Sequence, residues 1–148
     1  MIAKIFKAVI VDDEPPARDI INAYLGVFPQ IEVVAQCANG FEALKAVQDF
    51  CPDIMFLDVQ MPKITGIELM QVMDNPPAVV FTTAYDEYAI KAFEMNAVDY
   101  LLKPFSTDRF HKAVDKVLAR LLNNTTKETI SLQLPENTES PFLTRIVV

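Results

Sequence analysis

The alternation of short apolar runs with helical patterns constrains the fold of this chain more than any other feature. Most of the runs are apolar on consecutive residues, which is typical of strands that are buried on both faces of a parallel sheet. Five segments qualify: Ala8–Val11, Ile31–Ala35, Ile54–Leu57, Ala78–Phe81 and Val98–Leu102.

Helical spacing fills the segments between these runs. Apolar residues recur three or four positions apart over residues 17–28 and 110–121, and shorter candidate helices cover 41–50, 66–74 and 87–95. Five strands that alternate with five helices predict a doubly wound α/β domain, with a five-stranded parallel sheet and helices on both faces. One possible strand order is 2-1-3-4-5, as in flavodoxin-like folds, whose ligand site lies at the carboxyl ends of the strands. Periodicity alone leaves the order open.

The chain changes character after Leu122. The segment "NNTTKETISLQLPENTESP" is polar and rich in Thr, Asn, Ser and Pro, so we expect residues 123–141 to be a linker. The segment "FLTRIVV" has the composition of a strand, and a lone strand is not stable. We therefore expect one domain over residues 1–122 and the truncated start of a second domain over 142–148.

The composition argues against several classes of function. A net charge of −7 disfavours nucleic-acid binding by this part of the chain, since phosphate contacts need a basic face. Lys4 and Lys7 interrupt the apolar start, unlike a signal peptide, and no segment reaches the roughly 18 apolar residues of a membrane span. Cys37 and Cys51 are not spaced as a metal or redox pair. We therefore expect both cysteines to serve as small apolar residues in a reducing compartment. We expect a cytoplasmic protein, with the single histidine, His111, at its surface.

Charged and hydroxyl side chains gather where the predicted strands end. Because parallel strands end at the same edge of a sheet, these residues are expected to lie close together. Clustered carboxylates need a cation at neutral pH, and oxygen ligands without Cys or His favour Mg²⁺. A lysine and a hydroxyl beside that ion would hold a phosphoryl group. The residues at the strand ends are Asp12, Asp13, Glu14, Asp58, Thr82, Thr83 and Lys103.

Each of these residues also has a purely structural interpretation. Asp12 and Asp13 precede "EPPAR" and could cap a helix, and Asp58 could be a turn residue. Thr83 could bond to backbone at a strand end, and Lys103 could be a solvated charge. Their joint occurrence at one end of successive strands favours a functional site.

Three motifs in order carry a family resemblance. The segments "VIVDDEPPAR", "PDIMFLDVQMPKITGIEL" and "FTTAYDEYAIKAFEMNAVDYLLKPF" are similar to the receiver domain of bacterial two-component response regulators, from about Lys7 to Leu122. The third motif resembles the subgroup whose output is a LytTR-type (LytR/AlgR-type) DNA-binding domain. Residues 142–148 lie where such a domain would begin.

The resemblance implies a role for each residue at the strand ends. Asp58 would be the phosphoacceptor. Asp13 would bind Mg²⁺, or Mn²⁺, directly, and Asp12 would bind mostly through water. The backbone carbonyl of Gln60 would complete the protein ligands of the ion, and the long Gln60 side chain could reach the phosphoryl group. Lys103 would pair with the phosphoryl oxygens.

Two further residues are implied as the switch. Thr83 matches the hydroxyl that follows the phosphoryl group better than Thr82 does, and Tyr100 occupies the aromatic position that would turn inward. The bond between Lys103 and Pro104 is expected to be cis, a form found almost only before proline.

The resemblance also implies partners. A sensor histidine kinase would donate its phosphoryl group to Asp58 in an in-line transfer, so the chain would be a signalling phosphoacceptor and not an enzyme with its own substrate. Phosphorylation would shift a population of existing states and favour a homodimer through the face of helix 87–95, strand 98–102 and helix 110–121. DNA would be bound only through the missing C-terminal domain, and no membrane is expected.

Three alternatives from other classes remain open at this point. A haloacid-dehalogenase-like, Mg²⁺-dependent phosphatase needs a second Asp two residues after the nucleophile, where this chain has Gln60. A flavodoxin-like FMN carrier binds phosphate in its first loop, but the acids of residues 12–14 would repel an anion. A receiver-like module that only binds protein partners would not need all the reactive positions that are present. Turnover of phosphate monoesters and the colour of the protein would discriminate the first two.

Overall fold

The structure is a computed structural model that describes residues 4–133, and the expected start of a second domain, 142–148, lies outside these residues. The chain divides within its last helix into two units, Met1–Val117 and Leu118–Val148. The sheet and all residues of the candidate site lie in the first unit.

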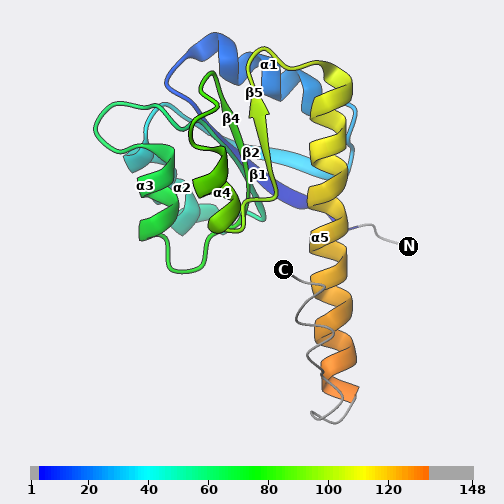
Figure 1. The fold of residues 1–148 in the computed structure, drawn as a ribbon. Coiled ribbons are helices and arrows are strands. Elements are labelled where there is room, and N and C mark those ends of the chain that lie inside the picture. Colours follow the sequence, from blue (N-terminus) through cyan, green and yellow to red (C-terminus); the bar gives the residue numbers. More distant parts are fainter. Residues whose placement is uncertain (1–3, 134–148) are drawn as a thin grey trace. The chain divides into compact units, whose positions relative to one another are not determined.

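The first unit contains a five-stranded, all-parallel sheet with the order β2-β1-β3-β4-β5, as Figure 1 shows. This confirms the predicted fold class and strand order. The strands are β1 (Phe6–Val11), β2 (Ile31–Cys37), β3 (Ile54–Leu57), β4 (Ala78–Thr83) and β5 (Asp99–Leu102).

One helix follows each strand, which is the alternation that the sequence predicts. The helices are α1 (Pro15–Leu25), α2 (Gly40–Phe50), α3 (Gly66–Val72), α4 (Ala89–Glu94) and α5 (Thr107–Gln133).

Helices cover both faces of the sheet because successive strand side chains point to opposite sides. On one face Val9, Met55 and Phe81 belong to a buried cluster with residues of α2, α3 and α4. On the other face Phe56 stacks on Phe110 of α5 with ring centroids 5.3 Å apart. Figure 1 shows α2, α3 and α4 together on one side of the sheet.

The central position of β3 in the sheet explains why its residues are apolar without interruption. It lies between β1 and β4, and all four of its side chains are fully buried. Burying each large apolar side chain contributes about 1.5–3 kcal/mol. The strand ends one residue before Asp58, whose backbone N–H donates to the carbonyl of Val11 at 3.0 Å. The most strongly buried strand therefore fixes the position of that carboxylate.

The last helix differs from the prediction at both ends. It begins at Thr107, where the Ser106 hydroxyl accepts from the backbone N–H of Arg109 at 3.0 Å. It continues to Gln133, so residues 123–133 of the expected linker are helical. A helix can also connect two domains, so the boundary at residue 122 stays a prediction.

Two expectations about single residues are wrong. Cys37 is buried at the end of β2 as expected, but Cys51 is exposed, because it ends α2 with a left-handed backbone at φ 47°. His111 is half-buried, because its ring packs edge-on against Phe28 with centroids 5.1 Å apart. Its packing against Phe28, which lies between α1 and β2, could not be read from a helix pattern alone.

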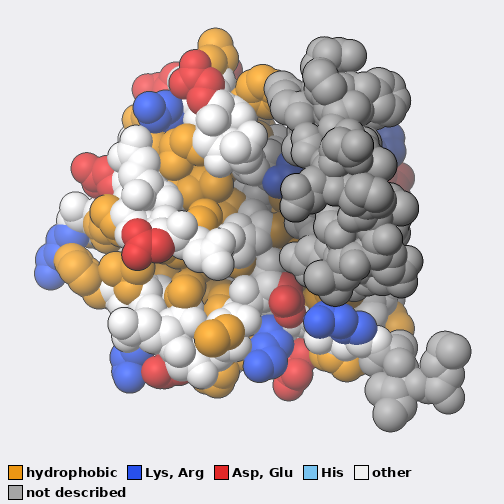
Figure 2. All heavy atoms as spheres, turned by 90° about the horizontal axis from the view of Figure 1, so that it is seen from below, with side chains coloured by type: hydrophobic (Ala, Val, Ile, Leu, Met, Phe, Trp, Pro, Cys, Tyr) orange, Lys and Arg blue, Asp and Glu red, His pale blue; other side chains and the backbone are white. Residues whose placement is uncertain are grey.

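The surface carries mixed charges. Figure 2 shows the molecule from below, where the Lys and Arg side chains that are coloured lie scattered among acidic and hydrophobic ones, without a continuous basic area. Among the described residues, no helix has both the length and the apolar character that crossing a bilayer requires.

Candidate functional site

Three carboxylates meet where β1 and β3 end. Asp12 and Asp58 directly follow two neighbouring strands, since Val11 pairs with Leu57 in the sheet. Asp12, Asp13 and Asp58 each offer an oxygen, and these oxygens lie within 4.8 Å of one another. Asp12 is fully buried and Asp58 is 5% exposed, whereas Asp13 is exposed. The strand ends thus bring together the three acids that the sequence predicts.

Lys103 reaches this cluster from the end of β5. Its Nζ lies 2.7 Å from Oδ2 of Asp12 and 3.8 Å from Oδ2 of Asp58. Burial lowers the pKa of Lys103, but the hydrogen bond from its ammonium to Asp12 and the charge of Asp58 raise it more, so the pKa lies above its ordinary value. Lys103 is therefore a fixed cation beside Asp58 at neutral pH. The bond to Pro104 is cis, which confirms the expectation.

The position of Asp12 is fixed from three directions. Its backbone N–H donates to the carbonyl of Cys37 at 3.0 Å, and its Oδ1 accepts from the backbone N–H of Glu14 at 2.9 Å. Arg18 of α1 donates through Nη1 to the Asp12 carbonyl at 2.6 Å. Arg18 could not be predicted as part of the site, because an arginine in the first turns of a helix gives no signal of its partner.

The carboxyl of Asp58 holds its proton more tightly than an ordinary aspartate. Burial raises its pKa to about 6, against the lowering effect of Lys103. The negative charge of Asp12 raises the pKa further, while hydrogen bonds from the Thr83 hydroxyl and the Gln60 backbone amide lower it. At pH 7 and above the group is ionised, and it is then a carboxylate with restricted hydration beside a cation.

The raised pKa of Asp58 predicts how stability depends on pH in the absence of divalent metal. The folded state binds this proton more tightly than the unfolded state, so the free energy of unfolding falls as pH rises from about 4 to about 6 and is then level. A shift from 3.8 to about 6 corresponds to about 3 kcal/mol. Chemical denaturation at pH 4 and pH 7.5 should therefore show that Asp58→Asn gains stability relative to wild type at the higher pH. Parallel pH curves for the two proteins would contradict the buried, ionised Asp58.

The loop after Asp58 is held close to the acid. Gly66 donates its backbone N–H to the Val59 carbonyl at 2.8 Å. A Cβ on Gly66 would lie 2.2 Å from the carbonyl oxygen of Asp58, so only glycine fits there. Thr65 and Glu68 form a reciprocal capping box that starts α3 immediately after this loop. The local sequence "TGIE" thus sets both the loop and the helix that follows.

The residues predicted as the switch lie on the next strands. Thr83 is fully buried at the end of β4, and its hydroxyl accepts from the backbone N–H of Tyr85 at 3.4 Å. Tyr100 of β5 is half-buried, and its hydroxyl donates to the Tyr85 carbonyl. Gln60 donates through its side-chain amide to the hydroxyl of Tyr88 at 2.9 Å. The sequence predicted Gln60 as a site residue but gave no signal for Tyr88.

The three acids fit a hard divalent cation. They provide only oxygen donors, and two of the three carboxylates are buried, where uncompensated negative charge is costly. One lysine compensates part of that charge. The donor set is therefore compatible with Mg²⁺ or Mn²⁺, and no Cys or His lies among these donors to favour a softer metal.

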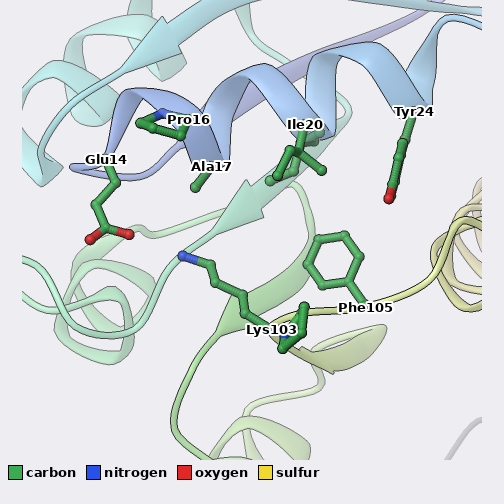
Figure 3. A pocket seen from close by; sticks show the side chains of 9 residues that line it. Glu14, Pro16, Ala17, Ile20, Tyr24, Lys103 and Phe105 are labelled. Carbon is green, nitrogen blue, oxygen red and sulfur yellow. The ribbon is translucent and has the colours of Figure 1, made fainter.

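A pocket of about 300 Å³ opens beside Lys103. It lies between α1 and the segment that follows β5, and Figure 3 shows Lys103 extending from one wall toward the start of α1. Ile20, Tyr24 and Phe105 form much of its apolar lining. An apolar surface thus lies next to the charged site.

A second ionic group ties β5 to α5. Arg109 donates to both carboxylate oxygens of Asp99 at 2.8 Å each, and Lys116 Nζ lies 3.2 Å from Asp99. Burial raises the pKa of Asp99, but the hydrogen bonds from Arg109 outweigh this, and the pKa is lowered overall. This group could not be predicted from the sequence, because its members are up to 17 positions apart on two different elements.

The sheet order, the acid cluster and the lysine define a receiver domain, and the comparison of sequences agrees. The family described as "Response regulator receiver domain" matches residues 8–115. The chain belongs to this family.

The individual relatives of this chain include transcriptional regulatory proteins. The transcriptional regulatory protein BtsR from Escherichia coli (strain K12) is 47% identical over 136 residues, which is 90% of this chain and 55% of the relative. The chain therefore spans about half the length of the curated relatives it matches.

Solved structures show the same fold. The response regulatory domain of protein mrkE from Klebsiella pneumoniae has a TM-score of 0.72 at 33% identity, over 77% of this chain and 96% of that one. The REC domain of AraT, a response regulator from Geobacillus stearothermophilus, has a TM-score of 0.71 at 32% identity, over 82% and 98%.

Proposed function

We propose that this chain is the phosphoryl-accepting receiver of a transcriptional response regulator, with Asp58 as the acceptor. The supporting observation is the geometry around Asp58. It is a buried carboxylate 3.8 Å from the Lys103 ammonium, beside two further acids that suit a divalent cation. A carboxylate with so little hydration is a better nucleophile than a solvated one.

The proposed reaction is an in-line phosphoryl transfer. A carboxylate oxygen of Asp58 forms a bond to phosphorus while the bond from phosphorus to the donor nitrogen breaks, and the nitrogen keeps the electron pair. Lys103 balances negative charge on the phosphoryl oxygens, and the Thr83 hydroxyl is close enough to Asp58 to donate to them. A Mg²⁺ or Mn²⁺ ion held by Asp12, Asp13, Asp58 and the Gln60 carbonyl would neutralise the remaining charge.

The donor that we propose is a phosphohistidine of a sensor histidine kinase. The chain belongs to the receiver family, and the apolar pocket beside Lys103 offers a protein partner a surface next to the acceptor. A small phosphodonor would not need such a surface. We also propose that the transfer takes place in the cytoplasm, where a regulator of transcription such as BtsR would work.

The output that we propose is control of transcription through a LytTR-type DNA-binding domain beyond this chain. BtsR is named a transcriptional regulatory protein, and about half of its length lies outside the match. Phosphorylation would favour a homodimer through the face of α4, β5 and α5. On that face Ile90 and Phe93 are each 75% exposed and Leu102 is 45% exposed, which is apolar surface available for a partner.

Acetyl phosphate tests the acceptor chemistry without a kinase. With Mg²⁺ present, we expect mass spectrometry to show the gain of one phosphoryl group, and hydroxylamine to remove it because an acyl phosphate is labile to that nucleophile. Removal of divalent metal by a chelator should suppress the gain by at least about 100-fold, since the three acids would then repel the incoming phosphate. Incorporation that is equally fast without metal would contradict the proposed cation site.

A phosphatase remains the alternative class to exclude. The residue two positions after Asp58 is Gln60, an amide that cannot act as an acid or base. We therefore expect no sustained turnover of phosphate monoesters. Turnover at more than one product per protein would overturn the proposal.

A further inference from the structure

Gln60 contacts the acceptor and the start of α4 at the same time. Its backbone amide bonds to the Asp58 carboxylate. Its side-chain amide donates to the Tyr88 hydroxyl at 2.9 Å, across 28 positions of sequence. Tyr88 is the residue that immediately precedes the first turn of α4. One residue thus bridges the reactive site and a helix that exposes two large apolar side chains, Ile90 and Phe93, beside charged ones.

The bridge continues from Tyr88 into β5. The backbone N–H of Tyr88 bonds to the Tyr100 hydroxyl, and that hydroxyl donates to the Tyr85 carbonyl. The segment 84–88 is therefore held at both ends by side chains of other elements. Its own side chains are mostly exposed, so these hydrogen bonds account for much of what positions it.

We expect the Gln60 side-chain amide to gain a stronger acceptor once Asp58 carries a phosphoryl group, because the backbone amide of the same residue already bonds to the Asp58 carboxylate. A phosphoryl oxygen bears negative charge, and hydrogen bonds to charged acceptors are roughly twice as strong as those between neutral groups. The Tyr88 hydroxyl is a neutral acceptor. The Gln60 side-chain amide carries two N–H donors, so the exchange requires that a turn of this side chain toward the phosphoryl group break its bond to Tyr88.

We propose that Gln60 exchanges its hydrogen bond to Tyr88, here called the clasp, for a hydrogen bond to the phosphoryl group. Gln60 is then a positioning residue for the start of α4. The inference rests on the proposed function. In the unphosphorylated protein the clasp holds Tyr88, and through it α4, against the acceptor loop. When Gln60 donates to the phosphoryl oxygens, Tyr88 is released. The position of α4, and of Ile90 and Phe93 on it, then depends on the occupancy of Asp58.

Beryllofluoride, which mimics a phosphoryl group on a carboxylate, tests the exchange in the full chain with Mg²⁺. Tyr88→Phe keeps the ring and removes only the competing acceptor, so we expect it to bind beryllofluoride about two- to ten-fold more tightly than wild type. Fluorine NMR of the bound anion measures this constant. Tyr85→Phe removes a hydroxyl three residues away and is the matched control, because Tyr85 joins the contacts described here through its backbone. Its constant should equal that of wild type.

A double-mutant cycle separates a clasp from a local effect of Tyr88. In the Gln60→Met background the donor is absent, so Tyr88→Phe should have no further effect on beryllofluoride binding. Equal affinity of wild type and Tyr88→Phe, weaker binding of Tyr88→Phe, or the same tightening in the Gln60→Met background would each overturn the exchange.

Amide hydrogen exchange of residues 84–88 in the unphosphorylated protein provides a readout that does not depend on phosphoryl chemistry. We expect faster exchange in Tyr88→Phe than in wild type or Tyr85→Phe. If wild type fails to bind beryllofluoride, the proposed function fails, and the exchange between acceptors fails with it. Equal hydrogen exchange in Tyr88→Phe and wild type would show instead that the clasp itself does not hold the segment.

Discussion

Asp58→Asn is expected to abolish phosphoryl incorporation from acetyl phosphate, to below about one part in a thousand of the wild-type level. An amide oxygen carries no negative charge and forms no stable bond to phosphorus, so the chemistry loses its nucleophile. We do not expect Asp12 to replace Asp58, because Asp12 is already bonded to Lys103 at 2.7 Å and is fully buried. Mass spectrometry of the intact protein after incubation with acetyl phosphate and Mg²⁺ measures the result.

The control for this variant lies at the other end of the same strand. Asp53 precedes β3 and accepts the backbone N–H of Lys7 at 2.8 Å, a role that an asparagine oxygen can also fill. Asp53→Asn should therefore incorporate phosphate as wild type does. Asp58→Asn should remain folded, because it relieves the cost of a buried carboxylate, so lost incorporation cannot be attributed to unfolding. Full incorporation in Asp58→Asn would place the acceptor elsewhere.

Gly66→Ala is expected to destabilise the protein by about 3 kcal/mol or more, at the upper end of what overpacking costs. Its Cβ would lie 2.2 Å from the Asp58 carbonyl oxygen and 3.0 Å from the carbonyl carbon. Both are backbone atoms, so no flexible side chain can move away. The φ of Gly66 is not positive, so the lack of space, and not the backbone conformation, requires glycine. Urea denaturation gives the free energy of unfolding.

Gly26→Ala is the matched comparison. There the new Cβ would lie 3.2 Å from the Ala23 carbonyl oxygen on an exposed helix end, with helical backbone angles. The change in unfolding free energy should stay within about 1 kcal/mol. If any folded Gly66→Ala is recovered, its phosphoryl incorporation should also fall, because the strained atoms belong to the acceptor itself. Equal stability of the two variants would mean that the loop after Asp58 is not packed as closely as described.

Much of the fold could be predicted from the sequence, because a strand that is buried on both faces of the sheet appears as an uninterrupted apolar run. The four residues of β3 are all buried and all apolar, and the predicted strand has the same bounds. The strand order was less constrained, since apolar runs carry no record of their neighbours. The start of α5 was missed by three residues, because Ser106 and Thr107 mark it by polar capping and not by apolar spacing.

The residues of the candidate site could be predicted from the sequence, but the hydrogen bonds and ion pairs between them could not. Parallel strands end at one edge of the sheet. The residues that follow them therefore lie close together, whichever side chains they contact. Which group pairs with which depends on the packing of helices. For this reason Arg18, Tyr88 and the partners of Asp99 carried no sequence signal. The roles predicted for Thr83 and Tyr100 on phosphorylation stay predictions.

The ion pair between Asp12 and Lys103 has a consequence for protein synthesis. Its two residues are 91 positions apart, so the site does not exist until nearly the whole domain has left the ribosome and closed its sheet. A nascent or truncated chain that already exposes Asp58 still lacks the cation that balances the incoming charge. If Asp58 accepts a phosphoryl group as proposed, a chain that is still being synthesised would not accept it until the domain is complete.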